Sequence, residues 1–390
     1  MTITALDLSA FVADRLVARN AASRALFDRE APRLARACEQ MADRFLRGGR
    51  LLAFGHGAAA TDAQHVSVEF VHPVIVGKRA LPALDLSAAF DRLLPVLVRE
   101  RDIVMGFGSG DAISTALGRA AARRAFTFAF SGVPADFAID PPSADPFIAQ
   151  ELVEILYHTL WETVHVFFEH RQHRPDDVGA SAFLYPFLGA AQRDTAGVVG
   201  DVAASIRSKA ADDERLRMEV AREQAAHIAS VIDAVRRRLA AGCTLLMFGN
   251  GGSATDANDW AIDCASPPPG AAAIRALSLS MEPANITAIA NDVGSDAIFL
   301  RQLIAHGRPG DVAIAISTSG GSANVIAALE HARQRSMMTV ALLGYDGGEI
   351  VRRGLADLPI VVRCDYIPRI QEVQASIYHV MTEAWRLWQR

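Results

Sequence analysis

Two glycine-rich segments of the chain carry the residue types that bind phosphate. Residues 249–253 (GNGGS) follow the apolar run TLLMF, and residues 317–322 (STSGGS) end the apolar run DVAIAIS. Glycines let backbone N–H groups approach an anion, and a helix that begins at such a loop adds its dipole. Serine, threonine and glycine also cap helices and form turns. Two such loops after apolar runs nevertheless favour a site for a phosphate monoester.

A second group of residues has the chemistry of a metal site or an acid–base pair. His65 and Glu69 are four residues apart and share a helix face. Gln150 and His158 are eight residues apart, separated by roughly 80° around a second helix. Two imidazoles, a carboxylate and an amide suit zinc or another divalent metal. Alternatively, Glu69 and His158 act as base and acid. A histidine and a glutamate at this spacing are more often a surface or capped pair, so further support is needed.

The support comes from an internal repeat. Gly249 matches Gly55 at an offset of 194, Ser319 matches Ser109 at 210, and His379 matches His158 at 221. Three blocks in the same order indicate a duplication, with a longer second copy. The extra residues lie around PANITAIANDVGSDAIFLRQL.

The two copies have kept different chemical groups. The first copy has GHGAA and FGSGDA where the second has the two phosphate loops, and its Asp111 would repel an anion. The second copy keeps both loops and has shorter or matching polar groups in place of the metal-type set: Asp259, Asp263, Gln371 and His379. We therefore expect a composite site that uses both copies, within the chain or across a dimer. The competing interpretation is that the first copy has decayed into a structural partner.

The elements that must position these residues follow one plan in each copy. Amphipathic helical stretches over 8–47 and 195–240 come first, and long helices near 144–171 and 368–388 come last. Between them, continuous apolar strands alternate with helical segments, which indicates a parallel sheet covered on both faces. We predict an α/β fold with domains at 1–175 and 190–390, joined by a linker at 172–194.

Composition excludes several classes of protein. Hydrophobic residues make up 51% of the 390-residue chain, so extensive disorder is excluded, and the net charge of −5 argues against a nucleic-acid partner. The four cysteines are scattered without a CxxC motif, which argues against a disulfide framework or a thiolate metal site. No apolar stretch has membrane-spanning length and the first residues do not resemble a signal peptide, so we expect a cytoplasmic protein without a membrane partner.

Four blocks together resemble the phosphoheptose isomerases, which have the SIS sugar-isomerase fold: GNGGSATDA, TAIANDVGSD, GDVAIAISTSGGSANVI and RIQEVQASIYHV. The resemblance covers essentially 195–390 and, more weakly, 30–171. It implies two SIS-type domains that interconvert sedoheptulose 7-phosphate and an aldose phosphate through an enediol, at the start of ADP-heptose synthesis. It also implies no nucleotide cofactor, zinc in some members, and a homodimer that forms a pseudo-tetramer of SIS domains.

The resemblance also implies roles for individual residues. The family's catalytic glutamate falls on Glu69 and Asp263, and its catalytic histidine on His158 and His379. Pro73 and Pro267 stand where the family has an arginine, and Pro368 stands where it has an aspartate. The implied substrate-binding residues are Asp292 and Gln371, and the phosphate-binding residues are Asn250, Gly251, Ser253, Ser317, Thr318, Ser319 and Ser322.

Other functions remain open at this point. SIS domains also serve as non-catalytic sugar-phosphate sensors or protein-interaction modules. A hexosamine-phosphate synthase also uses two SIS domains, but it needs a glutaminase with a catalytic cysteine, which we do not expect here.

Overall fold

A computed structural model describes residues 7–73, 78–172 and 195–388. The predicted linker lies, apart from Gln172, outside the described residues. Contacts divide the chain into two compact units, one of residues 20–212 and one of residues 1–19 with 213–390. We call them the first and the second unit.

The first unit contains a five-stranded sheet in the order β2-β1-β3-β4-β5. Every strand pair in it is parallel. Its strands are β1 (Leu51–Gly55), β2 (Ala83–Asp85), β3 (Ile103–Phe107), β4 (Phe126–Ala129) and β5 (Phe137–Ala138). Its helices include α2 (Ala59–Val71), α3 (Phe90–Leu97), α4 (Asp111–Ala122) and α5 (Pro146–Gln172).

The second unit repeats this order, with β7-β6-β8-β9-β10, again all parallel. Its strands are β6 (Leu245–Phe248), β7 (Ala276–Ser278), β8 (Val312–Ser317), β9 (Met338–Gly344) and β10 (Leu358–Val362). Its shorter elements are α8 (Gly252–Ala265), α9 (Pro283–Asp292), η2 (Ser295–Ala297), α10 (Ile298–His306), α11 (Ala323–Gln334) and α12 (Gly348–Arg352), and α13 (Ile367–Leu387) closes it. The predicted α/β class with two SIS-type domains is confirmed.

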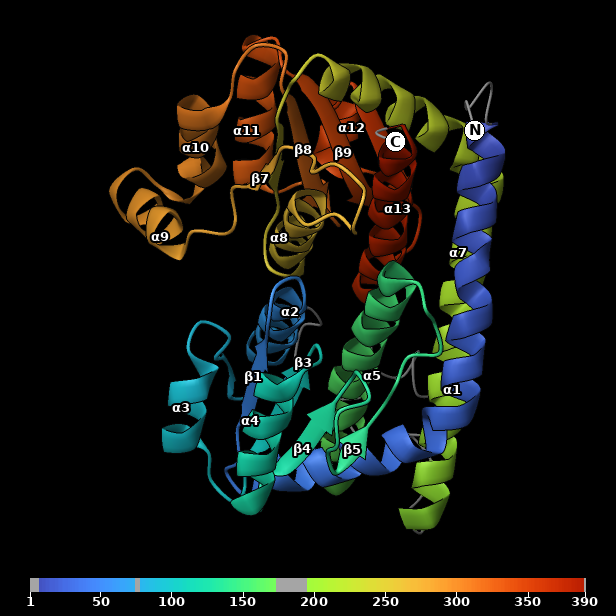
Figure 1. Ribbon diagram of the computed structural model, residues 1–390, viewed down its shortest axis with the longest axis vertical. Helices are drawn as coiled ribbons and strands as arrows, with labels where there is room; N and C mark the ends of the chain where they lie inside the picture. The colour runs from blue at the N-terminus through green and yellow to red at the C-terminus, as the bar shows by residue number, and fades with distance from the viewer. Residues whose placement is uncertain (1–6, 74–77, 173–194, 389–390) are drawn as a thin grey trace. The chain divides into compact units, whose positions relative to one another are not determined.

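Helices cover both faces of each sheet because the strands are apolar throughout. β1, β3, β6 and β8 are buried along their whole length. In the second unit, α8 and α13 pack on one face, and α10 and α11 on the other, which gives two separate apolar cores (Figure 1). The first unit likewise has two cores. This is the double layer of helices that a buried parallel sheet requires.

Equivalent hydrogen bonds recur in both units. Asp102 accepts the Arg50 backbone N–H at 3.1 Å, and Asp311 accepts that of Thr244 at 2.8 Å. Thr127 and Thr339 both donate their backbone N–H to an aspartate, Asp136 and Asp357 respectively, at 2.9 Å. The duplication therefore extends to single polar contacts at the strand ends.

The units differ between the second and third strands of each copy. The first unit has only α3 there, whereas the second has α9, η2 and α10. This is the longer segment that the repeat offsets predict. None of the residues of α9 is buried within the described chain, and the helix projects from its unit (Figure 1).

The two long lead-in helices pass from one unit to the other. The first 19 residues, which include the start of α1 (Leu8–Leu46), belong to the second unit, and Val12 and Leu16 enter its core. The start of α7 (Thr195–Ala240) belongs to the first unit, where Val202 and Ile206 are core residues. Each unit is therefore completed by a helical segment from the other copy of the repeat.

Every helix in the part of the chain that the structure describes is too short or too polar to cross a lipid bilayer.

Candidate active site

The first phosphate loop links β6 to α8. Gly251 has a φ of +58°, a left-handed conformation that favours glycine. At Gly249, a Cβ atom would lie 2.5 Å from the Ser253 carbonyl oxygen and 2.7 Å from that of Ile316. The sequence therefore needs glycine here for close backbone packing. Ser253 is buried in the first turn of α8, and Asn250 is exposed at the loop's tip.

The second phosphate loop links β8 to α11. The buried Ser317 hydroxyl accepts the Gly320 N–H at 3.1 Å, and the exposed Ser319 hydroxyl accepts the Gly321 N–H at 3.3 Å. Thr318 and Ser322 are half-buried, and Ser322 directly precedes α11. Hydroxyls and the first turn of a helix thus meet at one loop, as a phosphate monoester requires.

The two loops meet where ligands of open parallel sheets bind. β6 and β8 are adjacent, and the chain leaves them toward opposite edges of the sheet. The crevice beyond the carboxyl ends of two such strands is the usual ligand site of a doubly wound sheet. Asn250 and Asn324 join the loops there through two reciprocal amide hydrogen bonds of 2.9 Å. Sequence reasoning missed Asn324, although it follows Ser322 by only two residues.

A third glycine turn, also missed from the sequence, supports the second loop. The Gly344 N–H donates to the Thr318 carbonyl oxygen at 3.0 Å, and that of Ile350 donates to the Gly320 oxygen at 3.0 Å. A Cβ atom on Gly348 would lie 2.2 Å from the Ser319 carbonyl oxygen. The segment GYDGG at 344–348 is therefore a backbone support for the phosphate loop, and its glycines were the available signal.

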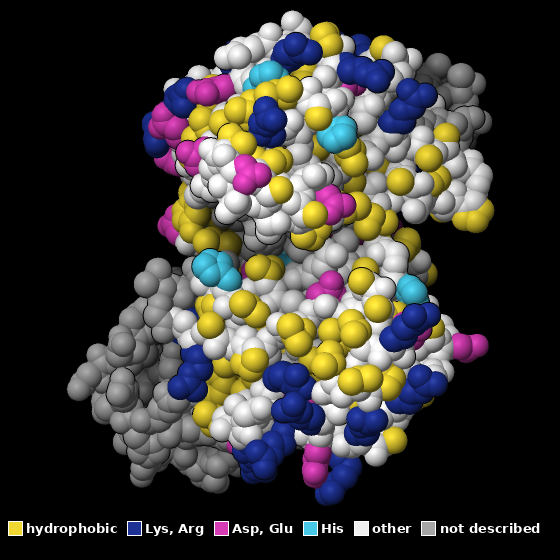
Figure 2. Space-filling view, turned by 90° about the vertical axis from the view of Figure 1, so that its left-hand side faces the viewer, with side chains coloured by type: hydrophobic (Ala, Val, Ile, Leu, Met, Phe, Trp, Pro, Cys, Tyr) yellow, Lys and Arg dark blue, Asp and Glu magenta, His cyan; other side chains and the backbone are white. Residues whose placement is uncertain are grey.

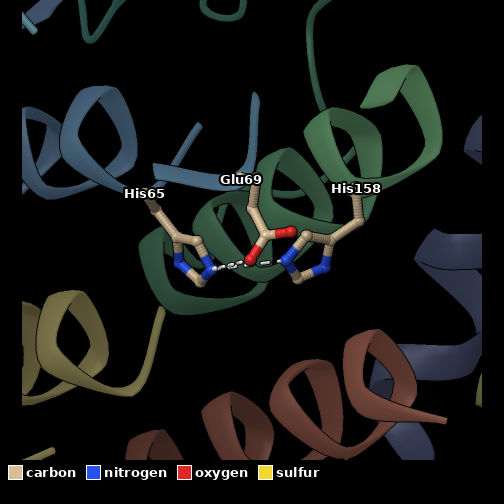
Figure 3. Close-up of side chains that lie close together, drawn as sticks. All are labelled: His65, Glu69 and His158. Atoms are coloured by element: carbon tan, nitrogen blue, oxygen red, sulfur yellow. Dashed lines mark hydrogen bonds and ion pairs between the residues drawn. The ribbon is translucent and has the colours of Figure 1, made fainter. Parts of the chain in front are cut away.

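In the first unit, three of the predicted metal-type residues converge. His65 and Glu69 extend from α2 and His158 from α5, and their side chains point toward one another (Figure 3). The two Nε2 atoms are 3.4 Å apart, and His65 Nε2 is 3.8 Å from a Glu69 carboxylate oxygen. All three residues are buried, and one ligand atom of each lies within 4.8 Å of the others.

This geometry fits a tetrahedral metal. With Zn–N bonds of about 2.05 Å, two ligand atoms of a tetrahedron are about 3.3 Å apart. The two histidine nitrogens already have close to that separation, at 3.4 Å. His65, Glu69 and His158 are thus a group in the first unit that could hold a metal, and Asp259, Asp263 and His379 are one in the second unit. Gln150 is half-buried and precedes His158 on α5 by eight residues, about 12 Å along the helix.

The second unit has a different cluster at the matching position. His379 Nε2 lies 3.6 Å from a carboxylate oxygen of Asp259 and 3.4 Å from one of Asp263. The Tyr378 hydroxyl donates to Asp259 at 3.0 Å. Burial, reinforced by the neighbouring Asp259 carboxylate, raises the pKa of Asp263 above its usual range, and His379 opposes the shift. The cluster of Asp259, Asp263 and His379 can therefore share a proton between its two carboxylates and its imidazole.

The remaining predicted residues lie apart from these clusters. Gln371 is buried on α13, eight residues before His379, and its carbonyl oxygen has no hydrogen-bond partner among the described residues. Asp292 is exposed at the end of α9 and accepts a hydrogen bond from Asn291 at 2.8 Å. In the first unit, His56 occupies the loop position of Asn250 and packs its ring edge against Phe90.

A family model described as the SIS domain matches residues 211–344. The phosphoheptose isomerase of Geobacter sp. (strain M21) is 44% identical over 157 residues, which are 40% of this chain and 79% of that protein. The chain belongs to the phosphoheptose isomerase family. The phosphoheptose isomerase of Geobacter sulfurreducens is 40% identical over 187 residues, 48% of this chain and 96% of that protein. This member of the family is an isomerase, and its relatives align with about half of its length.

A solved structure resembles nearly the whole chain. The C-terminal domain of glucosamine-fructose-6-phosphate aminotransferase from Francisella tularensis matches with a TM-score of 0.62 at 9% identity, covering 97% of this chain and 96% of that one. At this identity the likeness concerns the fold alone. It shows that the fold of this chain also occurs in a solved protein.

Proposed function

We propose that this phosphoheptose isomerase relative interconverts sedoheptulose 7-phosphate, or a related ketose phosphate, with the corresponding aldose phosphate, as a step toward ADP-heptose. The convergence of His65, Glu69 and His158 in a buried cluster carries the proposal. Decay of the first copy into a structural partner would not be expected to spare a compact set of acid–base groups while its phosphate loops were lost.

The residues suggest how the proton is moved. A carboxylate takes the proton from the carbon next to the carbonyl, and the C–H electron pair forms the double bond of a cis-enediol. The same carboxylate returns the proton to the neighbouring carbon. Glu69 is the proposed base, and His158 the group that exchanges the proton between the two substrate oxygens. Asp263 and His379 are the corresponding candidates in the second unit. The hydroxyls and amides of the two phosphate loops hold the substrate's phosphate.

The same cluster fits zinc or another divalent metal, with His65, Glu69 and His158 as ligands and Gln150 as the proposed fourth. A bound metal would polarise the substrate's carbonyl oxygen. We propose no nucleotide cofactor, since aldose–ketose isomerisation moves a proton within one molecule and needs no external redox partner.

Turnover of sedoheptulose 7-phosphate tests the function. We expect Glu69→Gln to lower kcat by about 10²-fold or more, the usual contribution of a general base. The matched change Asp263→Asn should lower kcat much less. The double change Thr318→Ala/Ser319→Ala should raise KM by at least about tenfold, because a hydrogen bond to a charged group contributes roughly 1.5–3 kcal/mol.

The outcomes separate the proposed role of Glu69 from two alternatives. Loss of activity in Asp263→Asn with an active Glu69→Gln variant would assign the chemistry to the second unit alone. Binding of the sugar phosphate in a thermal-shift assay without any turnover would favour a non-catalytic sensor.

Metal content tests the cluster independently of activity. Zinc measured by mass spectrometry on wild type is expected at one site per chain, and His158→Ala should lose it. A metal-free wild type, prepared without chelators, would leave only the acid–base role for these residues.

A further inference from the structure

Each phosphate loop of the second unit is fixed at its root by contacts of its own. At the first loop, the buried Ser280 hydroxyl accepts the Gly249 N–H at 3.4 Å and donates to the Gly249 carbonyl oxygen at 3.1 Å. At the second loop, the turn at 344–348 holds the backbone of Thr318 and Gly320. None of these four bonds joins the residues at the two loop tips, so they do not by themselves fix how far apart the tips lie.

The side-chain amides of Asn250 and Asn324 join the two loops. Each amide donates an N–H to the oxygen of the other, and both bonds are 2.9 Å long. Asn324 lies in the first turn of α11, and the next residue, Val325, is buried in a core of the unit. Asn250 is followed by Gly251, whose left-handed φ of +58° sets the path of the loop. Because both backbones are already held, this amide pair loses little conformational entropy when it forms.

The first unit, which lost the phosphate loops, has no such amide pair. His56 stands at the position of Asn250, and its ring packs against Phe90. The offset of 212 that relates the starts of β4 and β9 places Ala112 opposite Asn324. An alanine side chain has no group that could hydrogen-bond to the facing loop. The amide pair therefore occurs in the copy that kept the hydroxyl-rich loops and is absent from the copy that lost them.

We propose that Asn324 is a positioning residue, which fixes the tip of the first phosphate loop relative to the second so that the donors of both loops face one phosphate group. The inference rests on the proposed function and adds a residue that prepares its phosphate site. A phosphate that takes donors from two loops is bound more tightly when the loops are already in place, because binding then orders less of the chain. Asn324 acts through Asn250 in this proposal and does not itself contact the ligand.

Calorimetric titration of the full-length protein with inorganic phosphate tests the inference. Asn324→Ala should weaken phosphate binding by about fivefold or more, since it removes both bonds of the amide pair. Asn324→Gln, which keeps an amide, should retain more of the affinity. In a chain that already carries Asn250→Ala, adding Asn324→Ala should change the affinity by less than about twofold, because the two residues act as one unit.

Kinetics with sedoheptulose 7-phosphate give a second measure of the same role. Asn324→Ala should raise KM by about the same factor and leave kcat within about twofold of wild type, because it removes no proton-transfer group. Gln334→Ala is the control: it removes an exposed amide of the same helix, α11, ten residues beyond Asn324. This variant should leave the phosphate affinity, KM and kcat unchanged. Melting curves of every variant, recorded without ligand, establish that each one is folded.

An unchanged phosphate affinity in Asn324→Ala would overturn the inference and leave the proposed function intact. An equal loss with and without Asn250→Ala would show that Asn324 acts independently of Asn250, which also overturns the positioning role. Wild type that binds no inorganic phosphate would overturn the assignment of the two phosphate loops in the proposed function, and the inference with it.

Discussion

Glu69 and Asp263 occupy the same position of the two copies, yet their surroundings differ. Glu69 faces two imidazoles, whereas Asp263 faces one imidazole and the Asp259 carboxylate. Burial disfavours ionisation of Asp263, and the nearby Asp259 carboxylate acts in the same direction. Both clusters could hold a metal ion, but the second offers two carboxylates and one imidazole where the first offers one carboxylate and two imidazoles.

The raised pKa of Asp263 predicts how stability depends on pH. Because the folded-state pKa exceeds the unfolded value of about 3.9, the native state binds the proton more tightly. The resulting stabilisation is complete below the unfolded pKa and is lost as the pH rises through the folded pKa. We expect the melting temperature of Asp263→Asn, relative to wild type, to increase from pH 4 to 7. Asp292→Asn, an exposed carboxylate of the same unit, is the control, and a pH-independent difference for Asp263→Asn would contradict the prediction.

At the scale of elements, equivalent ion pairs hold the exchanged helical segments, which are the starts of α1 and α7 that belong to the other unit. Lys209 of α7 pairs with Glu162 of α5 in the first unit, and Arg15 of α1 pairs with Glu383 of α13 in the second. Lys209 and Arg15 are related by the repeat offset of 194, and Glu383 and Glu162 by that of 221. Arg19 also contacts Glu383, at 3.1 Å. The duplication has kept the contact that fixes each exchanged segment.

The two ion pairs differ in burial, which predicts that removal of their cations lowers the free energy of unfolding by different amounts. Lys209 and Glu162 are 6% and 1% exposed, so Lys209→Met removes one partner of a buried ion pair and should cost about 3–5 kcal/mol. Arg15 is 37% exposed and Arg19 remains beside Glu383, so Arg15→Met should cost at most about 1 kcal/mol. Urea unfolding curves measure both changes. A Lys209→Met variant with an unchanged free energy of unfolding would show that the buried pair does not hold the helix. The double variant Lys209→Met/Glu162→Leu should recover most of the stability that Lys209→Met loses.

At the scale of the whole molecule, we propose a homodimer that presents four SIS-type units. The face shown in Figure 2 carries many exposed hydrophobic side chains, and α9 has none of its described residues buried. Met281 and Val293, which flank α9, are 44% and 58% exposed. A helix with apolar flanks that packs so little on its own unit is suited to contact a second copy of the chain.

Light scattering coupled to size exclusion should therefore give twice the chain mass of 41.8 kDa. Val293→Glu should shift the protein toward the monomer without changing its far-UV circular dichroism spectrum, because an exposed substitution rarely costs more than about 0.5 kcal/mol of fold stability. A monomeric wild type would refute the dimer, and a dimeric Val293→Glu variant would place the interface elsewhere.

The sequence determined the duplication, the alternation of strands and helices within each copy and the two phosphate loops, because each depends on local patterns. Apolar strands, glycine loops and polar residues at helical spacing are visible without three-dimensional information. The cluster of His65, Glu69 and His158 was also predictable, since the repeat singled out those positions.

Only the tertiary structure decided how distant segments meet. Nothing local marks the exchange of the lead-in helices, because an amphipathic helix can bury its apolar face against either unit. The support of the Ser319 loop by the turn at 344–348, and the Asn250–Asn324 contact, join residues from different strands of one sheet. Such contacts are fixed by which strands become neighbours, and that is settled when the sheet assembles around its buried core.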